Sequence, residues 1–373
     1  MKSENLLCSQ QYCTGCGACM QVCKHHAIIM EFDILGFKRP KVNQELCTNC
    51  GLCSKKCPSL NPIPIAFPQC AIACHSIDET ERENSSSGAL ATILARTFIG
   101  KGGVVYGCAF LPHMEVKHIR CTKQADIQYI KGSKYVQSDL TSIYDSLKQD
   151  LANGVNVLFI GTPCQVAGIK AVFGKYDTLH TVDIICHGIS SLTIFKTTLP
   201  TMRNSDIDKI TFRKNNKYHL SITSSNGKLL YERPIDNDMY MKGYFNGTIF
   251  RSSCFTCQYA QPKRCSDITA GDFWGLKSDY IKDKDKGVSL ALINTPKGQE
   301  LFNECLSEMH FEKRPLEEAF AKNEQLNRPF KKNIRSAIFR YLFPKTGYNK
   351  AIWCALPDKV LAMKLKYILH NKK

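Results

Sequence analysis

The sequence lacks the long apolar segment that a membrane-spanning helix needs. None of its apolar runs reaches about 18 residues, close to the minimum for crossing a bilayer. The first residues, MKSENLLCSQQ, have no basic start followed by an apolar stretch, so they indicate no secretory signal. We therefore expect a cytoplasmic protein, in which reducing conditions favour free thiols and metal ligands over disulfides.

Length and composition predict a folded protein with more than one domain. The chain has 373 residues, more than one hydrophobic core usually serves. Hydrophobic residues make up 43% of it, which argues against disorder. It also contains 20 cysteines, and in a reducing compartment such a number indicates metal binding.

Two cysteine runs near the N-terminus share one spacing. Residues 13–23 (CTGCGACMQVC) and residues 47–58 (CTNCGLCSKKCP) both contain Cys-x2-Cys-x2-Cys-x3-Cys. This is the ligand run of bacterial two-cluster ferredoxins, in which the fourth cysteine of each run binds the other cluster. The runs therefore predict two 4Fe-4S clusters, one held by Cys13, Cys16, Cys19 and Cys57 and the other by Cys47, Cys50, Cys53 and Cys23.

Two other uses of these cysteines are less consistent with the spacing. Structural zinc sites also use four thiolates, but they usually pair two Cys-x2-Cys knuckles across a gap. A radical S-adenosylmethionine enzyme needs an isolated Cys-x3-Cys-x2-Cys, which the sequence does not contain. Three closely spaced cysteines followed by a fourth, given twice, are typical of iron–sulfur clusters.

A proline-rich stretch divides the cysteine runs from the rest of the chain. NPIPIAFP (61–68) contains three prolines and is predicted to form a stiff connector. We expect a two-cluster ferredoxin domain over residues 1–60, a linker over 61–69, a larger domain over 70–335 and a basic helical tail over 336–373.

The residues after the connector alternate between predicted strands and helices. NVLFIGTPCQVAGIK (156–170) is predicted as a buried strand, a turn and a helix start, and HTVDIICHGISS (180–191) as a second buried strand. Continuous apolar strands that alternate with helices predict a parallel or mixed sheet. The expected fold is an α+β ferredoxin-like N-terminal module followed by an α/β domain with a mixed sheet.

A further Cys-x-x-Cys pair, in CFTCQYA, has no second pair nearby. In α/β sheets ligands bind at the carboxyl ends of the strands, and Cys164 and Cys186 both follow predicted strands. Together with Cys254 and Cys257 they predict a third four-thiolate site. Cys265 is an alternative fourth ligand, and another alternative is that Cys164 and Cys186 are buried core thiols.

Several motifs together resemble the coenzyme F-420 hydrogenase/dehydrogenase beta-subunit family. These motifs are SSSGA (85–89), GSKYVQSD (132–139), GTPCQVAGIK (161–170), DIICHG (183–188), CFTCQYA (254–260), SDITAGDFWG (266–275) and KGVSLALINT (286–295). The resemblance extends to about residue 330. It implies an iron–sulfur flavoprotein that binds FAD and passes electrons between clusters, flavin and an organic acceptor, which in archaeal members is a deazaflavin coenzyme.

The resemblance implies a FAD pocket built partly by GSKYVQSD. Lys134 would place positive charge near the flavin or a phosphate, and Tyr135 would stack. The candidate cofactor-binding residues are Ser86, Ser87, Gly88, Gly132, Ser133, Lys134, Tyr135, Ser138 and Thr162. His187 is the candidate proton donor to a substrate. The alternatives are a polar loop with a solvated Lys134, serines that cap a helix, and a structural His187.

Basic residues exceed acidic ones, 50 to 33, for a formal net charge of +17. Such a surplus is typical of nucleic-acid-binding proteins, but the sequence contains no such motif and we expect no nucleic-acid partner. Three clusters and one FAD would contribute about −8, which leaves roughly +9. The remaining surplus suits an acidic redox partner such as ferredoxin.

These observations favour an oxidoreductase linked to ferredoxin or deazaflavin and acting on a small-molecule acceptor. The alternative is an electron-transfer subunit of a larger complex without an organic substrate of its own. The C-terminal stretch GYNKAIWCALPDKVLAMKLKYILHNKK (347–373) is basic and weakly amphipathic. Contact with an anionic membrane surface is one interpretation, but we expect this helix to pack on its own domain.

Overall fold

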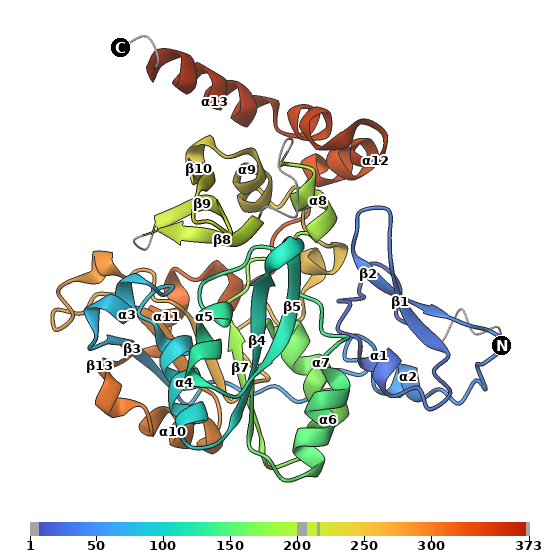
Figure 1. Ribbon diagram of the computed structural model, residues 1–373, viewed down its shortest axis with the longest axis vertical. Helices are drawn as coiled ribbons and strands as arrows, with labels where there is room; N and C mark the ends of the chain where they lie inside the picture. The colour runs from blue at the N-terminus through green and yellow to red at the C-terminus, as the bar shows by residue number, and fades with distance from the viewer. Residues whose placement is uncertain (1–6, 200–206, 215–216, 371–373) are drawn as a thin grey trace.

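The structure is a computed structural model that describes residues 7–199, 207–214 and 217–370 (Figure 1). Its N-terminal module contains a two-stranded antiparallel sheet and two short helices. These elements are α1 (Ala18–Gln21), β1 (Ile28–Phe32), β2 (Lys38–Val42) and α2 (Leu52–Lys55). Each helix begins after a left-handed glycine, Gly17 (φ 82°) or Gly51 (φ 73°), because the cysteine loop reverses direction there.

The larger domain is built on an eight-stranded sheet with the order β13-β3-β12-β11-β7-β6-β4-β5. Within this sheet, the adjacent strands β4, β6, β7 and β11 pair in parallel. The outer strands pair antiparallel. The mixed sheet predicted from the sequence is therefore confirmed. The strands are β3 (Cys70–Ser76), β4 (Val104–Leu111), β5 (Glu115–Cys121), β6 (Val157–Gly161), β7 (Leu179–Ile184), β11 (Ile268–Asp272), β12 (Ser289–Ile293) and β13 (Met309–Arg314).

Helices cover both faces of this sheet because successive side chains of each strand point to opposite faces. Val105 and Leu158 pack with α4, whereas their neighbours Val104 and Val157 pack with α6 and α7. The helices of this domain are α3 (Glu79–Glu83), α4 (Leu90–Gly100), α5 (Ile127–Ile130), α6 (Tyr144–Ala152), α7 (Pro163–Phe173), α8 (Leu192–Lys196), α10 (Pro296–Asn303) and α11 (Leu316–Ala321).

A second, three-stranded antiparallel sheet lies above the main sheet in Figure 1. It consists of β8 (Ile207–Lys214), β9 (Lys217–Ser224) and β10 (Leu229–Pro234), and it is followed by α9 (Met239–Phe245). The turn between β9 and β10 contains Asn226 followed by Gly227 in a left-handed conformation (φ 79°), a sequence that tight hairpin turns favour.

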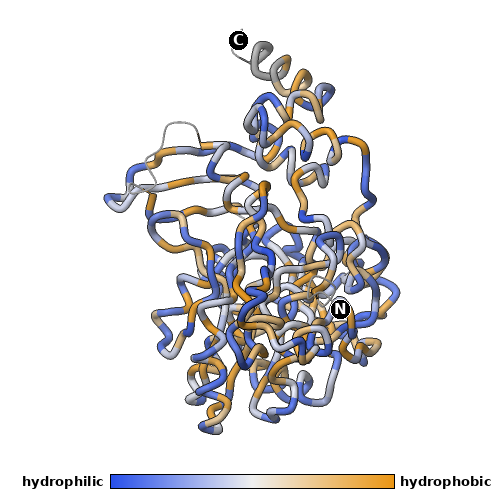
Figure 2. Tube along the Cα trace, turned by 90° about the vertical axis from the view of Figure 1, so that its right-hand side faces the viewer, coloured by the Kyte–Doolittle hydropathy of each residue, from blue (hydrophilic) through white to orange (hydrophobic). Residues whose placement is uncertain are grey.

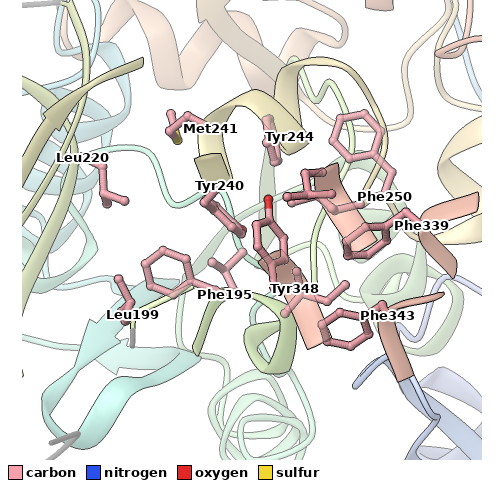
Figure 3. Close-up of a cluster of buried hydrophobic side chains, with 14 of the residues drawn as sticks. Phe195, Leu199, Leu220, Tyr240, Met241, Tyr244, Phe250, Phe339, Phe343 and Tyr348 are labelled. Carbon is pink, nitrogen blue, oxygen red and sulfur yellow. The ribbon is translucent and has the colours of Figure 1, made fainter. Parts of the chain in front are cut away.

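The tail consists of α12 (Ile334–Ala355) and α13 (Pro357–His370). Helix α12 packs on its own domain, because Phe339, Phe343 and Tyr348 enter the hydrophobic cluster beside α9 (Figure 3). The packing predicted for residues 347–373 is met only in part, since Tyr348 is buried whereas Leu361 and Leu365 of α13 are exposed. Figure 2 shows α13 extending away from the body with hydrophobic and hydrophilic residues mixed along it. In the part of the chain that the structure describes, no helix is long and apolar enough to span a membrane.

We expect Phe339→Ala to lower the free energy of unfolding by about 3–5 kcal/mol, because it leaves a cavity in a closely packed cluster. Phe339 is 1% exposed and its ring stacks on Phe343 at 5.3 Å between centroids. Tyr341→Ala is the matched control on the same helix, since Tyr341 is 67% exposed. Urea unfolding of both variants tests the packing, and equal losses of stability would contradict it.

Candidate cofactor-binding cavities

The two predicted sets of front cysteines line separate cavities. One cavity is lined by the first set, Cys13, Cys16, Cys19 and Cys57, together with Cys8 and Cys53. The other is lined by the second set, Cys23, Cys47, Cys50 and Cys53. The structure thus brings the fourth cysteine of each run to the other run, in the crossed arrangement that the spacing predicts.

The thiols of each front set surround a cavity rather than a single point. Among residues 7–199, 207–214 and 217–370, no group of three or more Cys, His, Asp or Glu side chains is positioned around a single metal ion. A 4Fe-4S cluster is held differently, because each of its four thiolates binds a different iron. Four thiols around a common cavity are the donor set that such a cluster requires.

The third predicted set also lines one cavity, of about 90 Å³. Cys164 lies in the first turn of α7, directly beyond β6, and Cys186 follows the end of β7. Cys254 and Cys257 come from the short 3-10 helix η6 (Ser252–Thr256) and the residue after it. The carboxyl ends of two parallel strands and one distant loop therefore meet here.

Cys265, the alternative fourth ligand, is placed elsewhere. Its side chain is 3% exposed and its thiol donates to the carbonyl oxygen of Pro163 at 3.6 Å. It lies in the hydrophobic cluster beneath α7 and does not line the third cavity. The structure therefore groups Cys164, Cys186, Cys254 and Cys257 and leaves Cys265 outside.

A large cavity, of about 240 Å³, opens at the carboxyl ends of the parallel strands. Except for Gly88, all the candidate cofactor-binding residues line it, and so does His187. These residues are Ser86, Ser87, Gly132, Ser133, Lys134, Tyr135, Ser138 and Thr162. Segments far apart in the sequence therefore converge on one space.

Gly88 has a packing role next to this cavity. Its amide donates to the hydroxyl of Ser289 at 2.9 Å, and a Cβ at this position would lie 2.3 Å from the carbonyl oxygen of Cys74. Only glycine lets the segment approach β3 and β12 this closely. Gly88 does not line the cavity and has no direct access to a bound cofactor.

The neighbouring serines do not cap α4, so that interpretation of them is wrong. The N-cap residue is Ala89, in a left-handed conformation (φ 71°) and without a side-chain hydrogen bond. Ser87 donates to the carbonyl oxygen of Val288 at 2.7 Å. Ser86 accepts a hydrogen bond from the amide of Ser133 at 3.0 Å, which joins the SSSGA and GSKYVQSD segments at the cavity wall.

Lys134 is half-buried in the cavity wall. Its Nζ donates to the carbonyl oxygen of Lys131 at 2.7 Å. Burial lowers the pKa of Lys134 to about 8, an effect that the nearby thiols of Cys108 and Cys121 oppose. An ammonium group with little solvation favours an anionic ligand, because such a ligand restores part of the lost charge stabilisation.

The cavities adjoin one another in a single row. The two front cavities share Cys53, and the first of them shares Thr14 and Ser59 with the third cavity. The third cavity shares Cys186 and His187, among other residues, with the large one. The row therefore leads from the N-terminal module to the carboxyl edge of the main sheet.

A side chamber of about 110 Å³ continues the row beyond the large cavity. The two share Arg213, Tyr218, Asp272 and Trp274. Arg213 forms an ion pair with Asp272 at 2.5 Å, and the ring of Trp274 lies 5.2 Å from that of His187. None of these four residues is predicted from the sequence as a site residue, although Asp272 and Trp274 belong to the motif SDITAGDFWG.

The two front cavities carry the donor sets of iron–sulfur clusters. Residues 12–61 match the family model for the 4Fe-4S dicluster domain. Residues 154–319 match the model for the C terminus of the coenzyme F420 hydrogenase/dehydrogenase beta subunit. The chain is therefore an iron–sulfur electron-transfer protein, and the match over residues 154–319 confirms the resemblance to this beta-subunit family that was noted from the sequence.

The chain is also similar to chains of solved structures, and one of these comes from an archaeon. That structure is described as a xenon derivatization of the F420-reducing [NiFe] hydrogenase complex from Methanosarcina barkeri. The two chains are 17% identical with a TM-score of 0.47, and the match covers 74% of this chain and 94% of the other. A comparison with curated proteins found no match.

Proposed function

We propose that this chain is an iron–sulfur flavoprotein oxidoreductase. It moves electrons between two N-terminal 4Fe-4S clusters, a third 4Fe-4S cluster, FAD and an organic acceptor or deazaflavin coenzyme. The observation that supports this best is the continuous row of cavities, in which cysteine-lined spaces lead to the large one. Adjoining cavities would hold redox groups next to one another, as electron exchange between them requires.

The large cavity fits FAD in the chemistry of its wall. Lys134 supplies a cation, and Ser86, Ser133 and Thr162 supply hydroxyl groups for the dinucleotide. When bound, FAD exchanges single electrons with iron–sulfur clusters and electron pairs with organic molecules. The residues of the chain hold and orient it and exclude water from the space next to Cys186.

The side chamber is the proposed acceptor site. It opens off the large cavity on the side of His187 and Trp274, so an acceptor there would lie next to the flavin. Trp274 offers a face for stacking, and the Arg213–Asp272 pair offers a donor and an acceptor of hydrogen bonds. His187, which lines the large cavity beside Trp274, is the proposed proton donor to the acceptor.

The second candidate function is an electron-transfer subunit that docks on another enzyme. It is favoured by the family description, which names a beta subunit, and by the exposed position of Cys50 in the second front cavity. A cluster near the surface suits exchange with a protein partner, and the basic surplus suits an acidic one such as ferredoxin.

Cofactor content and flavin reoxidation test the proposal. Anoxically purified protein is expected to hold about twelve irons, as many sulfides and about one FAD per chain. Its reduced flavin is then challenged with deazaflavin coenzyme and with small organic acceptors in the absence of other proteins. Absence of flavin contradicts the proposal, and reoxidation only in the presence of a protein partner favours the second candidate.

A further inference from the structure

Arg251 lies between the N-terminal module and the larger domain, and its side chain is fully buried. Its guanidinium donates three hydrogen bonds, to the carbonyl oxygens of Cys13 and Lys38, both at 2.8 Å, and to Oε1 of Gln137 at 3.0 Å. It donates a further hydrogen bond to Sγ of Cys13 at 3.7 Å. One side chain therefore reaches a thiol of the first front cavity, the loop that carries it, and the wall of the large cavity.

The backbone of Arg251 connects the same residue to the third cavity. Its amide donates to the carbonyl oxygen of Ile189 at 2.9 Å, and its own carbonyl oxygen accepts a hydrogen bond from the amide of Cys254 at 3.0 Å. Ile189 and Cys254 both line the third cavity. Arg251 thus lies between two proposed cluster sites and is bonded to a ligand-bearing loop of each.

Within the described part of the chain, the charge of Arg251 has no carboxylate partner. Among the residues that the structure describes, no Asp or Glu forms an ion pair with it, and its hydrogen-bond partners are carbonyl groups, an amide and a thiol. Arg264, which is also buried, is by contrast paired with Asp183 at 2.8 Å. A buried and unpaired charge is costly, so Arg251 requires negative charge nearby. Cluster thiolates supply that charge.

The N-terminal module is shaped to accept this guanidinium. Gly15 has a left-handed conformation, and a Cβ there would lie 2.9 Å from Nη1 of Arg251. The ring of Phe37 lies 5.4 Å below the guanidinium carbon on the other side. The cysteine loop and β2 therefore enclose the cation closely, which keeps water away from it and strengthens its field at the first front cavity.

We propose that Arg251 is a positioning residue that raises the reduction potential of the first front cluster. Reduction adds one electron to a site whose thiolates already make it anionic, and no bond is formed or broken. A buried cation stabilises the added negative charge, and a hydrogen bond to a cluster sulfur acts in the same direction. The inference rests on the proposed cluster sites and assigns a role to a residue outside their ligand sets.

The experiment is an EPR-monitored redox titration of the full chain, purified anoxically with its clusters. Arg251→Gln is expected to lower the midpoint potential of one front cluster by at least 59 mV, which is tenfold in a one-electron equilibrium. Arg251→Lys keeps the charge and is expected to shift it by less than half as much. An unchanged potential in the Gln variant overturns the proposal, and so does an equal shift in both variants.

Arg39→Gln is the matched control. Arg39 also donates to the carbonyl oxygen of Cys13, at 3.2 Å, but it is paired with Asp33 at 3.0 Å and is partly exposed. The Arg39→Gln variant is expected to shift the midpoint potential of the front cluster by less than half as much as Arg251→Gln does. A shift as large as that of Arg251→Gln counts against a specific role of Arg251.

If the Gln variant does not retain its iron, the Lys variant decides the question. A midpoint potential of the front cluster that differs from the wild-type value by more than 59 mV in Arg251→Lys, which is tenfold in the one-electron equilibrium, overturns the proposal. A smaller difference supports it. A wild-type protein with only about eight irons would remove the third cluster from the proposed function. The effect of Arg251 on the front cluster is measured independently of that result, so the two failures are distinguishable.

Discussion

Replacing Cys254 with alanine is expected to remove about four of about twelve irons per chain. Cys254 lines the third cavity with Cys164, Cys186 and Cys257, and a 4Fe-4S cluster is held by four thiolates. The front clusters should remain, because Cys254 is outside their cavities. Since the third cavity lies between the front cavities and the large one, electrons from the front clusters should no longer reduce the flavin. Iron analysis and stopped-flow absorbance measure the two losses.

Cys265→Ala is the matched control, because Cys265 is a buried thiol close to the third cavity that does not line it. This variant is expected to keep all its iron and to lose only stability. Iron that remains complete in Cys254→Ala would show that Cys254 is no cluster ligand. Loss of about four irons in Cys265→Ala would instead support the alternative ligand set.

Replacing Lys134 with glutamine is expected to weaken FAD binding by about 10- to 100-fold. This corresponds to the loss of one hydrogen bond from a charged donor, about 1.5–3 kcal/mol. The binding of wild-type protein should also weaken as the pH rises through about 8, because the free side chain then loses its proton. Below that pH, Lys134 is already charged and the affinity should be constant.

The measurement is a titration of FAD into flavin-depleted protein, followed by fluorescence, between pH 6.5 and pH 9.5 (about 1.5 units on either side of the pKa). Lys148→Gln is the control, since Lys148 is an exposed lysine on α6 that does not line the cavity. The Lys134→Gln variant should show no pH dependence in this range. A wild-type affinity for FAD that is constant across this pH range would show that the anionic part of FAD does not bind at Lys134. A loss of affinity in Lys148→Gln as large as that in Lys134→Gln would show the same.

The grouping of the cysteines was largely predictable from the sequence. Spacing alone predicts which front cysteines stand together, because each run is short and its loop can wrap only one centre. Cys164 and Cys186 were predictable because both follow buried strands, and the carboxyl ends of parallel strands meet at one edge. The mixed sheet followed from the same alternation of strands and helices.

Other parts of the site depend on contacts that no local pattern contains. Arg251 acquires its partners from residues 13, 38 and 137, which only the folded chain brings together. The packing role of Gly88 depends on the carbonyl oxygen of Cys74 across the sheet. The domain boundary at the connector remains a prediction, since Ala66 exchanges two backbone hydrogen bonds with Arg264 in the larger domain.

The attachment of the N-terminal module limits how freely it could be exchanged in evolution. Its first cysteine loop is held by Tyr144, which donates to the carbonyl oxygen of Cys16 at 2.7 Å, and by Gln137, which donates to that of Thr14 at 3.0 Å. A Cβ at Gly168 of α7 would lie 2.7 Å from Cβ of Cys16. A ferredoxin taken from another protein would therefore need the same loop shape, so domain shuffling at this junction requires coordinated changes on both sides.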